Sequence, residues 1–90
     1  MNVRVIELCS YGEVGDYEAL DLDAEPLNLD FIPPGWIERG GNHEARKYVK
    51  DSLELQVYVE GRLILFSAPT RGPGRDMAKE FLELWPRNTL

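Results

Sequence analysis

At 90 residues the chain can form one domain but not two, since each half would be too small to build a core without disulfides or a metal. Hydrophobic residues make up 43% and charged residues 29% of the chain, which excludes wholesale disorder, and the formal net charge is −6. The single cysteine, Cys9, excludes an internal disulfide, and with neither a signal-peptide pattern nor a membrane-spanning apolar run we expect a cytoplasmic protein without a membrane partner.

Alternating apolar and polar residues predict strands in the first third of the chain. Residues 2–9 have this pattern except that Arg4 and Glu7 stand three apart, which indicates a β-bulge. A clear alternation covers residues 27–31 and a weaker one covers residues 17–22. We expect these last two segments to pair as a hairpin across the acidic turn between them.

Two further elements are expected before the centre of the chain. Residues 35–39 predict an edge strand. Residues 42–52 have apolar positions near helical spacing after an asparagine that could cap a helix, so we expect a short helix beginning at Asn42. Its inward residues would be Ala45, Tyr48 and Val49.

The clearest element is a β-hairpin over residues 53–67, whose first half alternates apolar and polar residues. A two-residue loop would force Glu60 to a positive φ, which glutamate disfavours. A three-residue loop requires positive φ only at Gly61 and forms the usual glycine bulge. We therefore predict the three-residue loop, which places Val57 opposite Leu63.

The chain closes with an amphipathic helix that Pro86 ends. Asp76 suits its N-cap or first turn. Its apolar residues stand at three- and four-residue spacing and are Met77, Ala78, Phe81, Leu82 and Trp85. We expect this helix to lie on the predicted hairpin. The predicted fold class is α+β: a mainly antiparallel sheet of four to six strands, a C-terminal helix packed on one face, and a second short helix.

No catalytic or metal-binding pattern is recognisable. Acyl-transfer chemistry needs a nucleophile beside a base, but the one thiol, Cys9, and the one imidazole, His43, stand far apart in the sequence. A structural zinc site needs four such ligands. We expect Cys9 to be a small buried hydrophobe and His43 to be exposed. We also expect the protein to be no enzyme and to hold neither cofactor nor metal.

Three other features have ordinary structural interpretations. Residues 21–25 alternate acids like the start of a calcium loop, but Pro26 stands where that loop needs glycine. Residues 70–75 form a glycine-rich loop with two arginines before a helix, yet their spacing matches no phosphate-binding fingerprint. We expect Trp36 to cover one end of the core rather than to bind a ligand.

The distribution of charge is the one functional signal. Between Val5 and Glu38 there are nine acidic residues and no lysine or arginine. Such a segment either receives the bases of the second half or forms an acidic face that attracts a basic protein. We predict that this protein is an inhibitor, adaptor or regulator with an acidic docking face for a basic partner protein. A nucleic-acid-binding protein is one example of such a partner. The predicted docking residues are Glu13, Asp16, Glu18, Asp21, Asp23, Glu25 and Asp30.

Other functions stay open at the level of sequence. The acids could serve only to solvate the surface. A nucleic-acid-binding protein would use the bases of the second half, although a net charge of −6 opposes direct contact with a polyanion. Those bases are Arg39, Arg46, Lys47, Lys50, Arg62, Arg71 and Arg75. A small enzyme built from carboxylates that the fold brings together is a third alternative, and a homo-oligomer formed through sheet edges is compatible with all of them.

Overall fold

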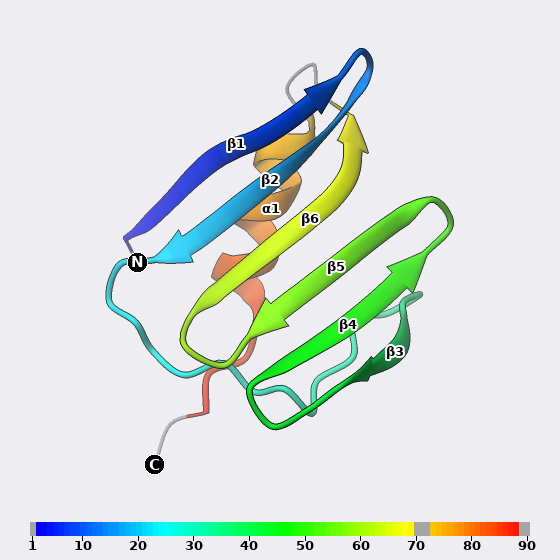
Figure 1. Ribbon diagram of the computed structural model, residues 1–90. Coiled ribbons are helices and arrows are strands. Elements are labelled where there is room, and N and C mark those ends of the chain that lie inside the picture. The colour runs from blue at the N-terminus through cyan, green and yellow to red at the C-terminus, as the bar shows by residue number, and fades with distance from the viewer. Residues whose placement is uncertain (1, 70–72, 89–90) are drawn as a thin grey trace.

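The computed structural model describes residues 2–69 and 73–88, which form a six-stranded antiparallel sheet and one helix (Figure 1). The elements in chain order are β1 (Val3–Tyr11), β2 (Val14–Asp21), β3 (Ile37–Gly41), β4 (Ala45–Lys50), β5 (Leu53–Tyr58), β6 (Arg62–Pro69) and α1 (Pro73–Leu84). The strands lie in the order β1-β2-β6-β5-β4-β3. The predicted α+β class, with its antiparallel sheet and C-terminal helix, is confirmed. In the part of the chain that the structure describes, no helix is long and apolar enough to cross a membrane.

The β5–β6 hairpin has the predicted connection and register. Val57 lies opposite Leu63, and Leu55 lies opposite Leu65. Gly61 closes the loop with a φ of 101°, a conformation that residues other than glycine rarely adopt. The four paired side chains share one face of the sheet and are fully buried, so this hairpin forms the centre of the core.

The amino-terminal strands pair differently from the prediction. β1 does contain the expected bulge, since its register against β2 shifts between Glu7 and Cys9. β2 includes most of the predicted strand over residues 17–22, but it pairs with β1 and β6. The predicted hairpin between this strand and residues 27–31 is therefore wrong.

Residues 27–31 form part of a loop rather than a strand. The alternation in this segment arises because Leu27 and Leu29 both enter the core. Asn28 turns the backbone between them, since its side-chain Oδ1 accepts the backbone N–H of Asp30 at 2.9 Å. A side chain that bonds its own neighbours in this way competes with the hydrogen bonds of a strand ladder.

The predicted helix over residues 42–52 is also wrong, because this segment forms β4 and the turns beside it. The Asn42 Oδ1 accepts the backbone N–H groups of Glu44 at 2.8 Å and Ala45 at 3.1 Å. A helix cap would make similar bonds, but here they close the β3–β4 turn. Tyr48 is fully buried on β4, which pairs with β3 on one side and β5 on the other. β3 is the edge strand that the sequence predicted.

α1 begins at Pro73, a favourable first position for proline, and has Asp76 in its first turn. It lies across β1, β2 and β6 and so covers only one strand of the predicted hairpin (Figure 1). The close approach depends on Gly74, where a Cβ atom would lie 2.7 Å from a ring carbon of Tyr17. The β2–β3 connection, residues 22–36, contributes Leu27, among others, to the core on this same face.

Trp85, just after α1, joins helix, connection and sheet. Its Nε1–H donates to the backbone carbonyl of Asn28 at 2.9 Å. Its ring meets Phe31 edge-on, with centroids 4.9 Å apart, and lies 5.6 Å from the ring of Tyr48. The Tyr48 hydroxyl in turn lies 2.9 Å from the Phe31 carbonyl and 3.2 Å from that of Leu29. The aromatic rings therefore hold the connection against both layers.

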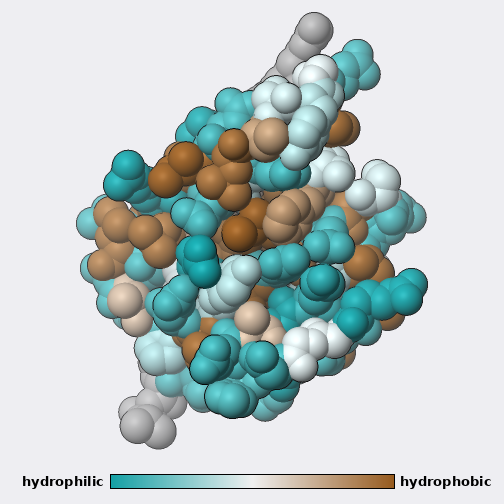
Figure 2. Space-filling model, viewed as in Figure 1, coloured by the Kyte–Doolittle hydropathy of each residue, from teal (hydrophilic) through white to brown (hydrophobic). Residues whose placement is uncertain are grey.

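Figure 2 shows the face of the sheet that points away from α1, where apolar residues gather along β1, β2 and β6 among polar ones. Alternation along the strands places Leu20 and Ile64 on this face. Glu18 and Arg62 form an ion pair at 3.3 Å there, and the Arg62 guanidinium lies 4.1 Å from the centroid of the Tyr58 ring. This face is thus partly apolar and partly screened by long charged side chains.

Replacing Tyr48→Phe should change the alkaline stability profile. Burial, with a smaller contribution from the charge of Glu38, raises the pKa of Tyr48 to about 12. A raised pKa stabilises the native state fully below the unfolded value of about 10 and loses that contribution as the pH rises toward 12. The variant should be about 1 kcal/mol less stable near neutral pH, because the hydroxyl hydrogen bond is lost. Urea unfolding at several pH values should show a shallower alkaline decline for the variant, and an unchanged slope would contradict the assignment.

Truncation of the two large aromatic residues of the carboxyl-terminal segment should give unequal losses of stability. Trp85 is 2% exposed, so Trp85→Ala should cost about 3–5 kcal/mol. Phe81 is only half-buried and meets Trp36 edge-on at 5.4 Å, so Phe81→Ala should cost about half as much. Denaturant melts of the two variants provide the comparison. Equal losses would mean that Phe81 anchors the core as strongly as Trp85 and would contradict the assignment.

Candidate functional site

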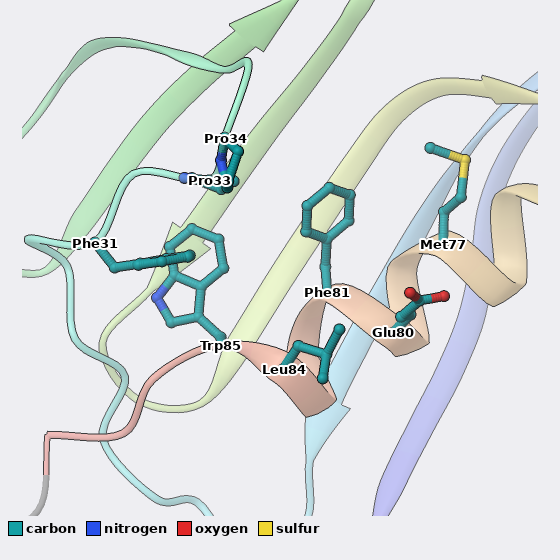
Figure 3. Close-up of a pocket in the computed structure, with 8 residues that line it drawn as sticks. All are labelled: Phe31, Pro33, Pro34, Met77, Glu80, Phe81, Leu84 and Trp85. Carbon is teal, nitrogen blue, oxygen red and sulfur yellow. The ribbon is translucent and has the colours of Figure 1, made fainter.

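α1 and residues 31–34 enclose a pocket of about 330 Å³ (Figure 3). The residues that line it are Phe31, Pro33, Pro34, Met77, Glu80, Phe81, Leu84 and Trp85. Those from the helical segment follow three- and four-residue spacing, so they form one stripe along its side. The pocket is thus the seam between the two segments that cover the buried face of the sheet.

The walls of this pocket are held by contacts outside it. Figure 3 shows Phe31 and Trp85 together at one end, Phe81 between Trp85 and Met77, and both prolines above the aromatic rings. The Phe31–Trp85 contact and the Trp85 hydrogen bond fix the first end. The edge-on contact with the buried Trp36 supports Phe81 from behind. Proline limits backbone motion on the opposite wall.

The pocket has the chemistry of a binding site for an apolar group beside a positive charge. Among its eight lining residues, Glu80 is the only ionisable one. Apolar walls favour a group that leaves water, and the faces of aromatic rings attract cations. Leu84, at 72% exposed, and Ile32, at 48% exposed, add apolar surface on α1 and beside the lining prolines.

The seven predicted docking residues do not form one face, and three of them have structural roles. Asp16 accepts the backbone N–H of Ser67 at 3.1 Å. Glu18 pairs with Arg62, as described above. Asp21 is buried beside Arg87, with 3.2 Å between Oδ2 and Nη2. Bases of the second half thus fold over part of the acidic segment.

The other four predicted docking residues are open to solvent but stand apart. Glu13 lies exposed at the β1–β2 turn, while Asp23 and Glu25 follow the opposite end of β2. The Glu25 side chain is 52% exposed even though it lies 3.5 Å from Arg87. Asp30 is 92% exposed and 3.9 Å from Arg46. Three of the four therefore belong to the β2–β3 connection.

The end of β2 and the neighbouring β5–β6 turn form a region that we call the acidic end. The two are adjacent because the Asp21 N–H donates to the Gly61 carbonyl at 2.8 Å. Its charged residues are Glu18, Asp21, Asp23, Glu25, Glu60, Arg62 and Arg87. Five carboxylates against these two guanidinium groups and that of Arg4, which stands opposite Leu20 on the neighbouring strand β1, leave two negative charges. The ion pairs therefore reduce the acidity of this region without cancelling it.

Three of the seven bases proposed for nucleic-acid contact, Arg46, Arg62 and Arg75, are engaged in contacts within the protein. Arg46 lies 3.2 Å from Glu38, and Arg75 donates to the Val5 carbonyl at 2.9 Å. A second cavity of about 350 Å³ does bring some of the bases together at the β3 edge. Its lining is Arg39, Gly40, Gly41, Ala45, Arg46, Lys47 and Gln56. Arg71 lies outside the described residues.

The remaining sequence predictions have mixed outcomes. Cys9 is exposed, so its prediction as a buried hydrophobe is wrong: it stands on the edge strand β1, beyond the area that α1 covers. Hydrogen bonds with Cys9 and Asp16 raise the pKa of Tyr11 to about 12. His43 is exposed, as predicted, though in a turn rather than a helix. Trp36 is 7% exposed and covers the core, as predicted.

Neither loop with a possible ion-binding pattern gains support. In residues 21–25 the Asp21 carboxylate accepts the N–H of Asp23 at 2.9 Å and pairs with Arg87, which gives it a structural role. Residues 70–72 of the glycine-rich loop lie outside the described part of the chain. Within the residues that are described, no three His, Cys, Asp or Glu side chains gather as metal ligands would.

Sequence reasoning did not find the pocket, because its two walls are far apart in the chain. One signal was available. Leu84 is an apolar residue beside the inward stripe of the helix, and it continues the line through Met77 and Phe81 at helical spacing. The run Pro33-Pro34 offered a second signal, since proline cannot donate to a strand ladder and fixes its backbone φ.

Comparison with protein-family models, with curated proteins and with solved structures finds no match to this chain. The candidate site of this chain consists of an apolar pocket beside α1, an acidic end where β2 meets the β5–β6 turn, and the β2–β3 connection that joins them.

Replacing Asp21→Asn should destabilise the protein by about 3 kcal/mol, because it leaves the Arg87 guanidinium, 10% exposed, without its buried counter-charge. Glu25→Gln removes the other carboxylate near Arg87 but acts in partly exposed surroundings, so it should cost less than about 1 kcal/mol. Urea denaturation of both variants measures the difference. Similar small losses would show that the buried pair contributes no more than a surface pair.

Proposed function

We propose that this protein is a small acidic interaction module that docks a basic protein partner, as an inhibitor, adaptor or regulator does. The observation that carries the proposal is the acidic end, which keeps two negative charges after its neighbouring arginines are counted. A negative region on a protein of net charge −6 attracts basic partners and speeds their association. A nucleic-acid-binding protein would present a suitable basic surface.

The proposed docking residues are the open acids of the β2–β3 connection: Asp23, Glu25 and Asp30. Their exposure supports the proposal, since a carboxylate already buried in an ion pair has little left to offer a partner. Asp21 instead helps to hold this connection in place, through its ion pair with Arg87 and its hydrogen bond from the Asp23 N–H. A cytoplasmic setting is part of the proposal, because the exposed thiol of Cys9 stays reduced there.

A second candidate function is favoured by one observation. The cavity at the β3 edge has Arg39 and Lys47 in its lining together with the amide of Gln56. Such a lining suits a phosphate or carboxylate group and would support an anion-binding or nucleic-acid-binding role. The pairing of Arg46 with Glu38 weakens that candidate, since it neutralises one of the three cations of the lining.

Partner capture from the native host lysate tests the proposed function. The double variant Asp23→Lys, Glu25→Gln raises the charge of the acidic end by three units, because it removes two carboxylates and adds one ammonium group, while Asp21 and Arg87 stay in place. We expect the partner to be lost, folding stability to stay within about 0.5 kcal/mol, and wild-type binding to weaken steeply as salt rises.

The matched control is Glu7→Gln, Glu13→Lys, which makes the same change of charge at exposed positions on β1 and its turn. Retention of the partner by the control and its loss in the first variant would support the acidic end. Equal binding by all three proteins would contradict the proposal. Capture of nucleic acid that Lys47→Glu abolishes would favour the second candidate instead.

A further inference from the structure

We propose that the pocket beside α1 receives an apolar side chain from a lysine- or arginine-rich segment of the protein partner. This inference rests on the proposed function and names the chemistry of the segment that docks. The pocket supplies the anchor point, and carboxylates along its border supply the charge that selects a basic segment. Three observations carry the inference: the charge pattern of α1, the exposed residues of the opposite wall, and the size and lining of the pocket.

α1 separates its charges by side. At 100° per residue, Glu80 falls beside the pocket residues Met77 and Leu84, and Asp76 and Glu83 follow farther round, on the side of the helix that faces away from the sheet. The bases Arg75 and Lys79 fall on the other flank by the same geometry. All of these charged side chains are on exposed residues of the helix.

An independent contact fixes which flank is which. Arg75 donates to the backbone carbonyl of Val5, so its flank of α1 faces the β1 edge of the sheet. The pocket is on the side of Phe31 and the prolines, so the flank with Glu80 borders it. Glu80 therefore places a carboxylate at the mouth of the apolar pocket, while Lys79 stands three residues from Asp76 and four from Glu83, close enough to neutralise them in part.

The opposite wall adds to this pattern. Asp30 immediately precedes the lining residue Phe31, and its side chain is 92% exposed. Ile32, next along the chain, is 48% exposed. Arg46 lies 3.9 Å from Asp30, and Lys50 is a second nearby base on this side: a Cβ atom on Gly35 would lie 3.3 Å from its ammonium nitrogen. Lys50 approaches the connection beyond the prolines and does not line the pocket.

The size and lining of the pocket suit one bulky side chain. A cavity of about 150 Å³ can hold a benzene ring, so about 330 Å³ accommodates phenylalanine, leucine or tryptophan with room for part of the backbone. Interfaces commonly gain most of their affinity from such an anchor in a pocket surrounded by polar groups. The 72% exposure of Leu84 also leaves an apolar side chain available for the partner to cover.

The β2–β3 connection links the acidic end to the pocket. The β2–β3 connection contains Asp23 and Glu25 near its start and Phe31 farther along. Two hydrogen bonds tie it to the end of the helical segment: Trp85 Nε1–H to the Asn28 carbonyl, and the Asn28 N–H to the Pro86 carbonyl, each at 2.9 Å. A basic segment that begins at the acidic end can therefore follow the connection to the pocket.

Synthetic peptides test this inference directly. The probe is a capped twelve-residue peptide of lysine and serine with one central phenylalanine. Two controls replace the phenylalanine with serine or every lysine with glutamate. NMR titration of the full chain should show binding of the probe, with shifts at the Met77 and Leu84 methyl groups. We expect each control peptide to bind at least tenfold more weakly.

Protein variants locate the binding. Glu80→Lys and Leu84→Ala change exposed residues, so both variants should fold. Each should lower the affinity for the probe peptide at least fivefold. The matched controls Glu44→Lys and Leu8→Ala make the same changes at exposed positions on the β3–β4 turn and on β1, and should leave binding unchanged. Thermal melts of all four variants confirm folding.

Several results would overturn the inference. Equal binding of the serine control peptide would mean that charge alone acts, and unchanged binding by Leu84→Ala would place the anchor elsewhere. Binding of neutral indole at the pocket without binding of the probe would indicate a small-molecule site. If the captured partner is lost from the Asp23 and Glu25 variant but retained by Glu80→Lys and Leu84→Ala, the proposed function stands and the pocket inference fails.

Discussion

The contact of Trp85 with the β2–β3 connection is the interaction on which the rest of the structure depends. This connection is fifteen residues long by its bounds, 22–36, and has no regular strand of its own. Such a long segment is costly to order unless large side chains fix it. Trp85 does so by bonding the Asn28 carbonyl and packing on Phe31 and Tyr48 at the same time. Without it, neither the aromatic end of the pocket nor the position of the acids would be defined.

Charge has two separate uses in this chain. Inside, the Asp21–Arg87 pair joins the end of β2 to the residues that follow α1, and Arg87 also donates to the Leu82 and Trp85 carbonyls at 2.9 and 2.7 Å. One guanidinium thus satisfies a helix end and a buried carboxylate together. Outside, carboxylates that no fold requirement explains gather along the connection and one flank of α1. The first use gives stability, and the second leaves a surface suited to a basic partner.

The sequence predicted the fold class, the β5–β6 register and the closing helix, because each rests on local periodicity and one glycine. It failed where an asparagine side chain serves a turn: the pattern at Asn42 predicts a helix cap, and the alternation around Asn28 predicts a strand, but both side chains bond turns. In both cases the same hydrogen bonds serve two conformations, and only tertiary pairing decides between them. The predicted docking residues included the acids that are open to solvent, but they also included the buried Asp21. The sequence could not show that burial, because it depends on a contact with Arg87, which is far away in the chain. The sequence did not predict the pocket for the same reason, because its two walls come from segments that are distant in the chain.

The bond from Arg75 to the Val5 carbonyl has a consequence for the sheet as a whole. Because the Leu22 N–H donates to the Asn2 carbonyl, alternation turns the backbone groups of Val5 away from β2 and toward the open edge. Such an edge offers a template on which a strand from another chain can add. The Arg75 guanidinium occupies the central acceptor of that template, and the bulge after Glu7 bends the remainder. The helix that carries the acidic flank thereby also occupies a backbone acceptor at the β1 edge that an added strand would need.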